Sequence, residues 1–128
     1  MAHEEHVERL LARWRVYGLR DILREDGTCD WQAVCEAYAK DYMEERELWY
    51  VLLEKNILST TLERNYTIIR NGHLWGPYFG WVGHLNFVRK EDAEGYFDNF
   101  YGKHGGLDSG HAKIIHCIDV QFRKMPEK

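Results

Sequence analysis

A chain of 128 residues, of which 45% are hydrophobic and 14% aromatic, can form one domain with a substantial core. This composition excludes a disordered chain, and no apolar run reaches the ~18–20 residues of a transmembrane helix. The net charge of −4 gives no general attraction to nucleic acid or to membranes.

The two halves of the chain differ in charge. Residues 1–64 carry 9 Lys and Arg against 14 Asp and Glu, whereas residues 65–128 carry 8 against 7. Neither half has the strong positive excess that is typical of nucleic-acid binders. The odd number of cysteines, three, and a polar N-terminus without a signal sequence predict a cytoplasmic protein.

Two helical segments are expected in the first half. Apolar residues at helical spacing predict a helix over residues 3–24, with Gly18 as a kink or close-packing point. Asp30 suits the N-cap of a second segment that stops at Asn56. Because residues 44–47 are polar on all sides, this segment is either one long helix or two. The buried stripes of these helices are predicted to include Tyr17, Tyr38 and Tyr42.

The second half is predicted to form a sheet and one helix. A β-prone run over residues 66–70 is followed by an Asn-Gly pair, a strong hairpin signal because both turn residues need a positive φ. Residues 79–88 predict one further strand, bulged at its glycines. A helix that begins near Glu91 and a strand over residues 113–123 complete the pattern.

This order of elements predicts an α+β fold in a single domain, residues 1–128. A helical hairpin within residues 1–64 is expected to pack on a small, mainly antiparallel sheet with ββ(β)αβ order within residues 65–124. Helices and strands do not alternate regularly, which favours an antiparallel sheet over a parallel one.

Aromatic residues crowd the segment between residues 75 and 101, and a domain of this size cannot bury all of them. Trp and Tyr are favoured at the energetic centres of protein interfaces. We therefore interpret part of this segment as a partner-binding patch and the rest as packing between sheet and helices. The predicted contacts of the patch are Trp75, Tyr78, Phe79 and Trp81.

Charged residues of the first half are candidates for the rim of that patch. Arg13 and Arg20 belong to a series of arginines on one side of the first predicted helix, and arginine suits bidentate recognition. Glu44 and Glu45 belong to an acidic run that suits a basic partner surface. Both sets also fit a plain solvated helix face with local ion pairs.

A loop rich in glycine, lysine and histidine over residues 102–113 is a weaker candidate site, for an anion. Its basic members are Lys103, His104, His111 and Lys113. A phosphate loop normally follows a strand and opens a helix, and here the order is reversed. The alternative is a long connection between helix and strand that binds nothing.

No motif in the sequence predicts a metal, a cofactor or a catalytic centre. His104, His111, His116 and Cys117 are close in sequence but fit no zinc signature, and the last two point to opposite faces of a strand. No nucleophile has a recognisable setting, so the pattern weighs against an enzyme without deciding the question.

The leading hypothesis is a non-catalytic protein-binding module. It would be a small regulatory or inhibitory accessory protein, of the kind that phages and mobile elements carry, that occupies a surface of another protein. A homodimer is compatible with it, because spare aromatic surface often forms a dimer interface. Nucleic acid ranks lower as a partner, no membrane partner is expected, and two alternatives remain. One is a single-stranded nucleic-acid binder that stacks bases on aromatic rings, and the other is a small enzyme or a metal or phosphate site on the loop over residues 102–116.

Overall fold

A computed structural model describes residues 2–18, 22–80, 83–101 and 111–117 of the chain, with side chains from residue 4 onward. The helices are α1 (Ala2–Val16), α2 (Trp31–Ala39), α3 (Glu45–Glu54) and α4 (Lys90–Phe100). The strands are β1 (Leu58–Ser59), β2 (Tyr66–Arg70), β3 (His73–Trp75), β4 (Tyr78–Phe79), β5 (Gly83–His84), β6 (Asn86–Phe87) and β7 (Ala112–His116).

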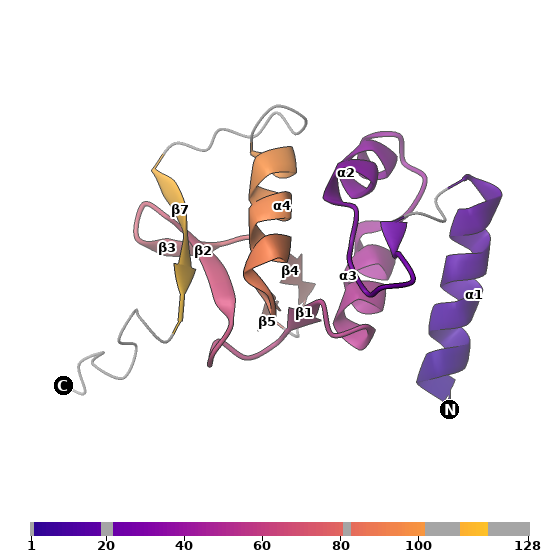
Figure 1. The fold of residues 1–128 in the computed structure, drawn as a ribbon, viewed down its shortest axis with the longest axis horizontal. Helices are drawn as coiled ribbons and strands as arrows, with labels where there is room; N and C mark the ends of the chain where they lie inside the picture. The colour runs from indigo at the N-terminus through magenta and orange to yellow at the C-terminus, as the bar shows by residue number, and fades with distance from the viewer. Residues whose placement is uncertain (1, 19–21, 81–82, 102–110, 118–128) are drawn as a thin grey trace.

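The elements form an α+β fold with the main sheet at one end and α1 at the other (Figure 1). α4 packs against β2, β6 and β7, α2 packs on α4, and α1 packs on α3. The hydrophobic core therefore runs from the sheet through α4 into the N-terminal helices. The predicted fold class, with N-terminal helices and a small antiparallel sheet, is confirmed. Within the described ranges, no helix has both the length and the apolar character that crossing a membrane requires.

α1 ends earlier than the sequence pattern predicts. Gly18 follows the last turn with a φ of 79°, a left-handed conformation that ends a helix. Leu23 then forms an antiparallel bridge with Cys29, so the chain has already turned back there. The predicted continuation of the helix beyond Val16 is wrong, because the glycine terminates the helix instead of kinking it.

The second helical segment is two helices, because a left-handed residue closes α2. Asp41 has a φ of 62°. Its amide donates to the carbonyl of Tyr38 at 3.2 Å, and the amide of Tyr42 donates to the carbonyl of Ala37 at 3.0 Å. This pair of hydrogen bonds is a Schellman motif, with Asp41 where glycine is usual. The motif turns the chain sharply before α3 begins.

Two predicted helix boundaries are confirmed. The side chain of Asp30 accepts the amide of Ala33 at 3.1 Å and so caps the start of α2. At the end of α3, Asn56 has a φ of 62°, and the amide of Ile57 donates to the carbonyl of Leu52 at 2.9 Å. Asparagine tolerates the left-handed region, so the predicted stop has a local cause.

β2 is the central strand of the main sheet. It pairs antiparallel with β3, β6 and β7, and β6 pairs in turn with β1. Asn71 and Gly72 link β2 to β3 with φ values of 54° and 83°, and Arg70 pairs with His73. The predicted two-residue hairpin is thus confirmed. β7 confirms the start of the predicted last strand, Cys117 lies in a turn after it, and residues 118–123 lie outside the described residues.

The single strand predicted over residues 79–88 is wrong, because the chain forms three short strands there. β4 and β5 make a separate two-stranded sheet in which Phe79 lies opposite Gly83, while β6 joins the main sheet. Gly80 and Gly83 have φ values of 48° and 98°. Two left-handed glycines reverse the chain, whereas the prediction gave them only a bulge.

Part of the aromatic-rich segment lies in the core. The ring of Tyr96, on α4, contacts the rings of Trp31, Trp49, Phe87 and Phe100 at centroid separations between 4.5 and 6.2 Å. All five side chains are buried. We call these five residues the buried aromatic cluster, and it joins α2, α3 and α4 to the sheet.

Trp31 locks α2 onto the first turns of α4. Its indole N–H donates to the buried carboxylate of Asp92 at 2.9 Å, and Arg89 donates to the other oxygen of Asp92 at 3.3 Å. Gly95 allows the close approach, because a Cβ at that position would lie 2.5 Å from Cδ1 of Trp31. The α2–α4 contact therefore depends on a glycine inside a helix.

Candidate partner-binding grooves

Two grooves adjoin the first turn of α3. The larger one, which we call the acidic groove, has a volume of about 760 Å³ and is lined by Arg13, Tyr17, Tyr38, Asp41, Tyr42, Met43, Glu44, Glu45 and Glu47. The smaller one, the β4 groove, has a volume of about 310 Å³ and is lined by Glu45, Arg46, Trp49, Tyr78, Phe79 and Gly80. Because Glu45 lines both grooves, they are adjacent parts of one surface.

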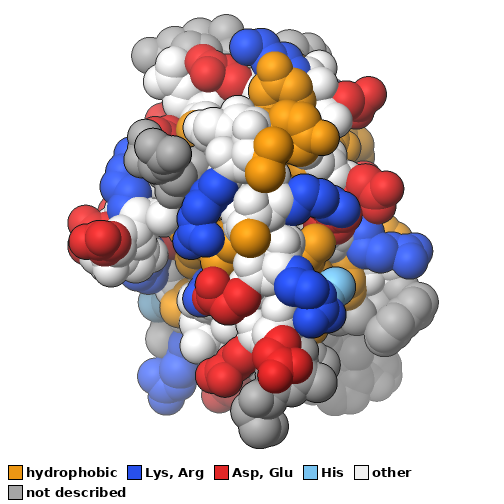
Figure 2. Space-filling model, turned by 90° about the vertical axis from the view of Figure 1, so that its right-hand side faces the viewer, with side chains coloured by type: hydrophobic (Ala, Val, Ile, Leu, Met, Phe, Trp, Pro, Cys, Tyr) orange, Lys and Arg blue, Asp and Glu red, His pale blue; other side chains and the backbone are white. Residues whose placement is uncertain are grey.

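Three segments of the helical half build the acidic groove. The C-terminal end of α1 supplies Arg13 and Tyr17, the turn after α2 supplies Asp41 and Tyr42, and α3 supplies its first-turn glutamates. Figure 2 looks onto α1 and shows hydrophobic side chains gathered near the top of this face, with charged side chains around them. The Schellman motif at Asp41 matters here, because it directs the chain from α2 across to α3.

The tyrosines of the acidic groove are open to solvent. Tyr17 and Tyr42 stack with ring centroids 5.1 Å apart and an interplanar angle of 11°, and they are 51% and 36% exposed. Tyr38 is 37% exposed. The sequence pattern assigned all three to buried stripes, and that prediction is wrong. Tyr17 and Tyr42 lie at or just beyond helix ends, where helical periodicity no longer fixes which side faces the core.

Two of the carboxylates in the groove are already engaged. Arg13 forms an ion pair with Glu47, and their hydrogen bond raises the pKa of the Arg13 guanidinium. Glu45 accepts the indole N–H of Trp49 at 3.1 Å. Glu45 also accepts the hydroxyl of Tyr38, whose pKa is raised first by burial and then by the charge of Glu45. These contacts fix one wall of the groove.

The other two carboxylates, on Asp41 and Glu44, have no ion-pair partner among the described residues. Both also occupy positions where a different residue would stabilise the fold more. Asp41 stands at the left-handed residue after α2, where glycine is preferred. Glu44 stands at the N-cap of α3 without making a side-chain cap bond, where Ser, Thr, Asp or Asn is preferred. The acidic groove thus holds four carboxylates against one guanidinium.

Most of the predicted partner contacts lie on this surface. Arg13, Glu44 and Glu45 line the acidic groove, and Tyr78 and Phe79 line the β4 groove, where Tyr78 is 61% exposed. Arg20 and Trp81 lie outside the described residues. The sequence pattern predicted an aromatic patch with separate charged residues at its rim. In the structure, the charged Glu45 lines both the acidic groove and the β4 groove.

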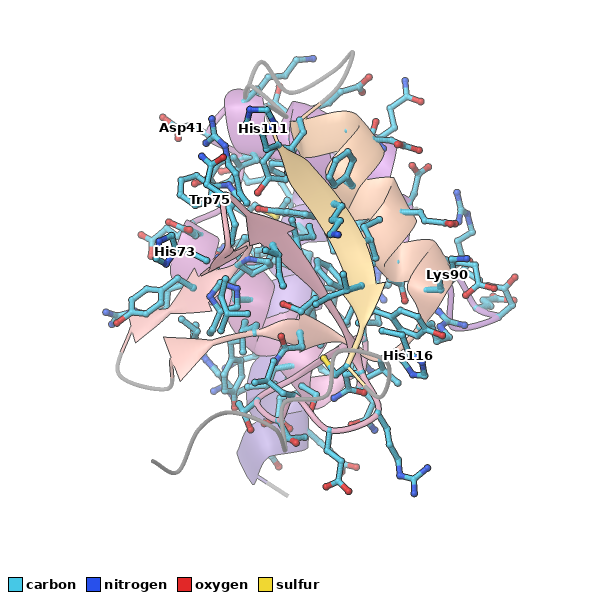
Figure 3. The ribbon with its side chains drawn as sticks, turned by 90° about the vertical axis from the view of Figure 1, so that its left-hand side faces the viewer. Asp41, His73, Trp75, Lys90, His111 and His116 are labelled. Atoms are coloured by element: carbon cyan, nitrogen blue, oxygen red, sulfur yellow. The ribbon has the colours of Figure 1, made fainter. Side chains whose placement is uncertain are left out.

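Trp75 lies apart from the two grooves. It belongs to β3, at the sheet end of the molecule, and does not line either groove (Figures 1 and 3). The guanidinium carbon of Arg70 lies 5.0 Å from the centroid of its ring, a cation–π contact across the hairpin. Trp75 is therefore exposed but already has a neighbour of its own.

The predicted anion loop lies mostly outside the described residues, which include His111 and Lys113 but neither Lys103 nor His104. His111 and Lys113 are exposed at the start of β7. His116 lies at the opposite end of that strand and stacks on Tyr66 at 4.4 Å (Figure 3). The histidines of this strand therefore do not converge.

The described residues form neither a metal site nor a site for thiol chemistry. No three His, Cys, Asp or Glu side chains come close enough there to hold a metal ion. Cys29, Cys35 and Cys117 are buried and form no disulfide bond, and burial raises the pKa of each thiol. A raised pKa disfavours the reactive thiolate.

Comparison of the chain with models of known protein families, with curated proteins and with solved structures gives no match. The functional assignment therefore rests on the geometry and charge of the two grooves.

Proposed function

We propose that this chain is a non-catalytic binding module that holds a basic segment of a partner protein in the acidic groove. The observation that carries the proposal is the pair of carboxylates on Asp41 and Glu44, which have no ion-pair partner in the described structure. Exposed tyrosines surround them. Tyrosine is enriched where interfaces gain most of their energy, and unpaired acids favour a positively charged partner.

The positions of these two acids strengthen the proposal. Sequences tend to break local rules of helix capping at functional sites and to follow them elsewhere. The caps at Asp30 and Asn56 follow the rules, and those at Asp41 and Glu44 do not. A cost in stability at these two neighbouring positions is expected if their carboxylates serve recognition.

The β4 groove extends the proposed contact surface. Tyr78 and Phe79 supply apolar area beside Glu45, so a partner segment that crosses this glutamate would contact both grooves. We infer a regulatory or inhibitory accessory role, because the proposed surface binds a partner and supplies no nucleophile. The three cysteines form no disulfide bond, which supports the expectation of a reducing compartment, such as the cytoplasm.

The test compares a groove variant with a charge-matched control. Asp41→Gly/Glu44→Ser removes both carboxylates and installs the residues that each cap prefers, so thermal stability should hold or rise. Glu5→Gln/Glu63→Gln removes the same charge from exposed positions outside both grooves. Each tagged protein is incubated with nuclease-treated lysate of the native host, and captured proteins are quantified by mass spectrometry.

We expect one protein with a basic segment to be captured by the wild type and the control, and lost from the groove variant. Equal capture by the groove variant would refute the proposal. A parallel capture is run without nuclease. Recovery of nucleic acid and no protein in that capture would also refute the proposal and would favour the nucleic-acid alternative.

A further inference from the structure

The acidic groove already holds one guanidinium group, that of the chain's own Arg13. Arg13 lines it from α1 and pairs with Glu47, and the charge of Glu44 also helps to raise the pKa of the Arg13 guanidinium. A guanidinium is therefore already accommodated beside carboxylates on this surface. Arg13 pairs with only one of the four acids, and the carboxylates of Asp41 and Glu44 have no ion-pair partner among the described residues.

The tyrosine pair supplies a flat surface next to the unpaired acids. Tyr17 and Tyr42 are nearly parallel, and Tyr42 follows Asp41 directly in the chain. A guanidinium is planar, weakly hydrated and able to stack on an aromatic face while its N–H groups reach carboxylates in its own plane. The ammonium group of lysine is not planar and lacks the forked arrangement of N–H donors that a guanidinium has. The combination of stacked rings and neighbouring acids suits arginine better than lysine.

We propose that the acidic groove selects an arginine side chain of the partner, which stacks on the open face of the Tyr17–Tyr42 pair and donates to Asp41 and Glu44. This inference rests on the proposed function, because it names the residue type within the basic segment. Lysine would still be attracted by the charge of the groove but would gain little from the rings.

Two synthetic peptides test the selectivity. One carries several arginines separated by glycine and serine, and in the other each arginine is replaced by lysine. Their dissociation constants for the full chain are measured by fluorescence anisotropy at low salt, because screening weakens exposed charges. From the usual strength of a partly exposed cation–π contact, we expect the arginine peptide to bind roughly fivefold to tenfold more tightly.

Four variants test whether the preference for arginine comes from the proposed residues. Tyr42→Leu should weaken binding of the arginine peptide to the level of the lysine peptide, and Tyr42→Phe, which keeps the ring, should restore it. Asp41→Gly/Glu44→Ser should weaken binding of both peptides. Trp75→Leu alters an exposed aromatic residue outside the groove and should change neither.

The outcomes separate this inference from the proposed function. Equal binding of the two peptides, or an arginine preference that survives Tyr42→Leu, would refute selection of arginine and leave the basic-segment proposal standing. Failure of both peptides to bind would also refute it, and the capture experiment would then decide the proposed function on its own. Capture that is unaffected by Asp41→Gly/Glu44→Ser would refute both.

Discussion

The buried aromatic cluster and the acidic groove contain similar aromatic side chains, but these side chains are buried in the cluster and exposed in the groove. Tyr96 contacts five aromatic rings and has almost no exposed surface, whereas Tyr17 and Tyr42 stack on each other and are exposed to solvent. The densest aromatic stretch of the sequence thus supplied much of the core. The acidic groove is lined by single tyrosines at or near the ends of helices, so a local run of aromatic residues does not by itself predict an exposed aromatic surface.

The difference follows from what surrounds each ring. α4 has the sheet on one side and α2 on the other, so its aromatic residues are enclosed, and burial raises the pKa of the neighbouring Tyr101 to about 12. By contrast, Tyr17 and Tyr42 follow the last residues of α1 and α2 and remain exposed. Three predictions test this contrast between the two regions, in order of decreasing effect.

Removal of a ring from the buried aromatic cluster should have the largest effect. Phe87 is 1% exposed and packs against Trp31 and Tyr96. Phe87→Ala should lower the free energy of unfolding by about 3–5 kcal/mol, because it removes buried apolar area and leaves a cavity. Urea unfolding followed by circular dichroism measures this. If the variant does not fold, Phe87→Leu should show a smaller loss of the same sign, and a loss below about 0.5 kcal/mol for either would contradict the assignment to the core.

A methyl group at the α2–α4 contact should have an intermediate effect. Gly95→Ala improves helix propensity by about 1 kcal/mol, but its Cβ would lie 2.5 Å from Cδ1 and 2.8 Å from Cγ of Trp31. Overpacking of this kind costs about 1–3 kcal/mol, so we expect net destabilisation and a shift in tryptophan fluorescence as Trp31 moves. A more stable Gly95→Ala protein would show that α2 is not held this tightly.

Removal of a ring from the acidic groove should have the smallest effect on stability. Tyr42→Ala breaks one exposed stacked pair and should lower the free energy of unfolding by less than about 1 kcal/mol. The same urea titration measures it. A loss comparable to that of Phe87→Ala would mean that the groove is part of the core and would remove the contrast between the two regions.

Local signals in the sequence predicted those elements whose cause is local. The cap at Asp30, the stop at Asn56 and the Asn-Gly hairpin each depend on a few neighbouring residues, and all three are confirmed. Gly18 and Gly80 were also noticed, but a glycine pattern does not reveal whether φ is positive. The length of α1 and the division of residues 79–88 were therefore missed.

The composition of the acidic groove could be predicted only in part. Arg13, Glu44 and Glu45 were predicted as contacts at the rim of the aromatic patch, with a plain solvated helix face as the alternative, and they line the acidic groove. Tyr17 and Tyr42 were missed because helical periodicity was extended past the ends of the helices, and Tyr38 was missed because the last turn of α2 leaves it partly open to solvent. The contact between α1 and the turn at Asp41 joins parts of the chain that no sequence pattern links, and only the folded chain brings them together.

The central position of β2 makes its alignment difficult to shift. β7 pairs along one edge of β2, and β6 and β3 share the other, so a slip by one residue would break three pairings together. Such a slip would also turn the fully buried Ile68 to the opposite face of the sheet. Strands that slide or keep a free edge are the usual starting points of mispairing between chains. The strand that organises this sheet is thereby the one least able to misassemble.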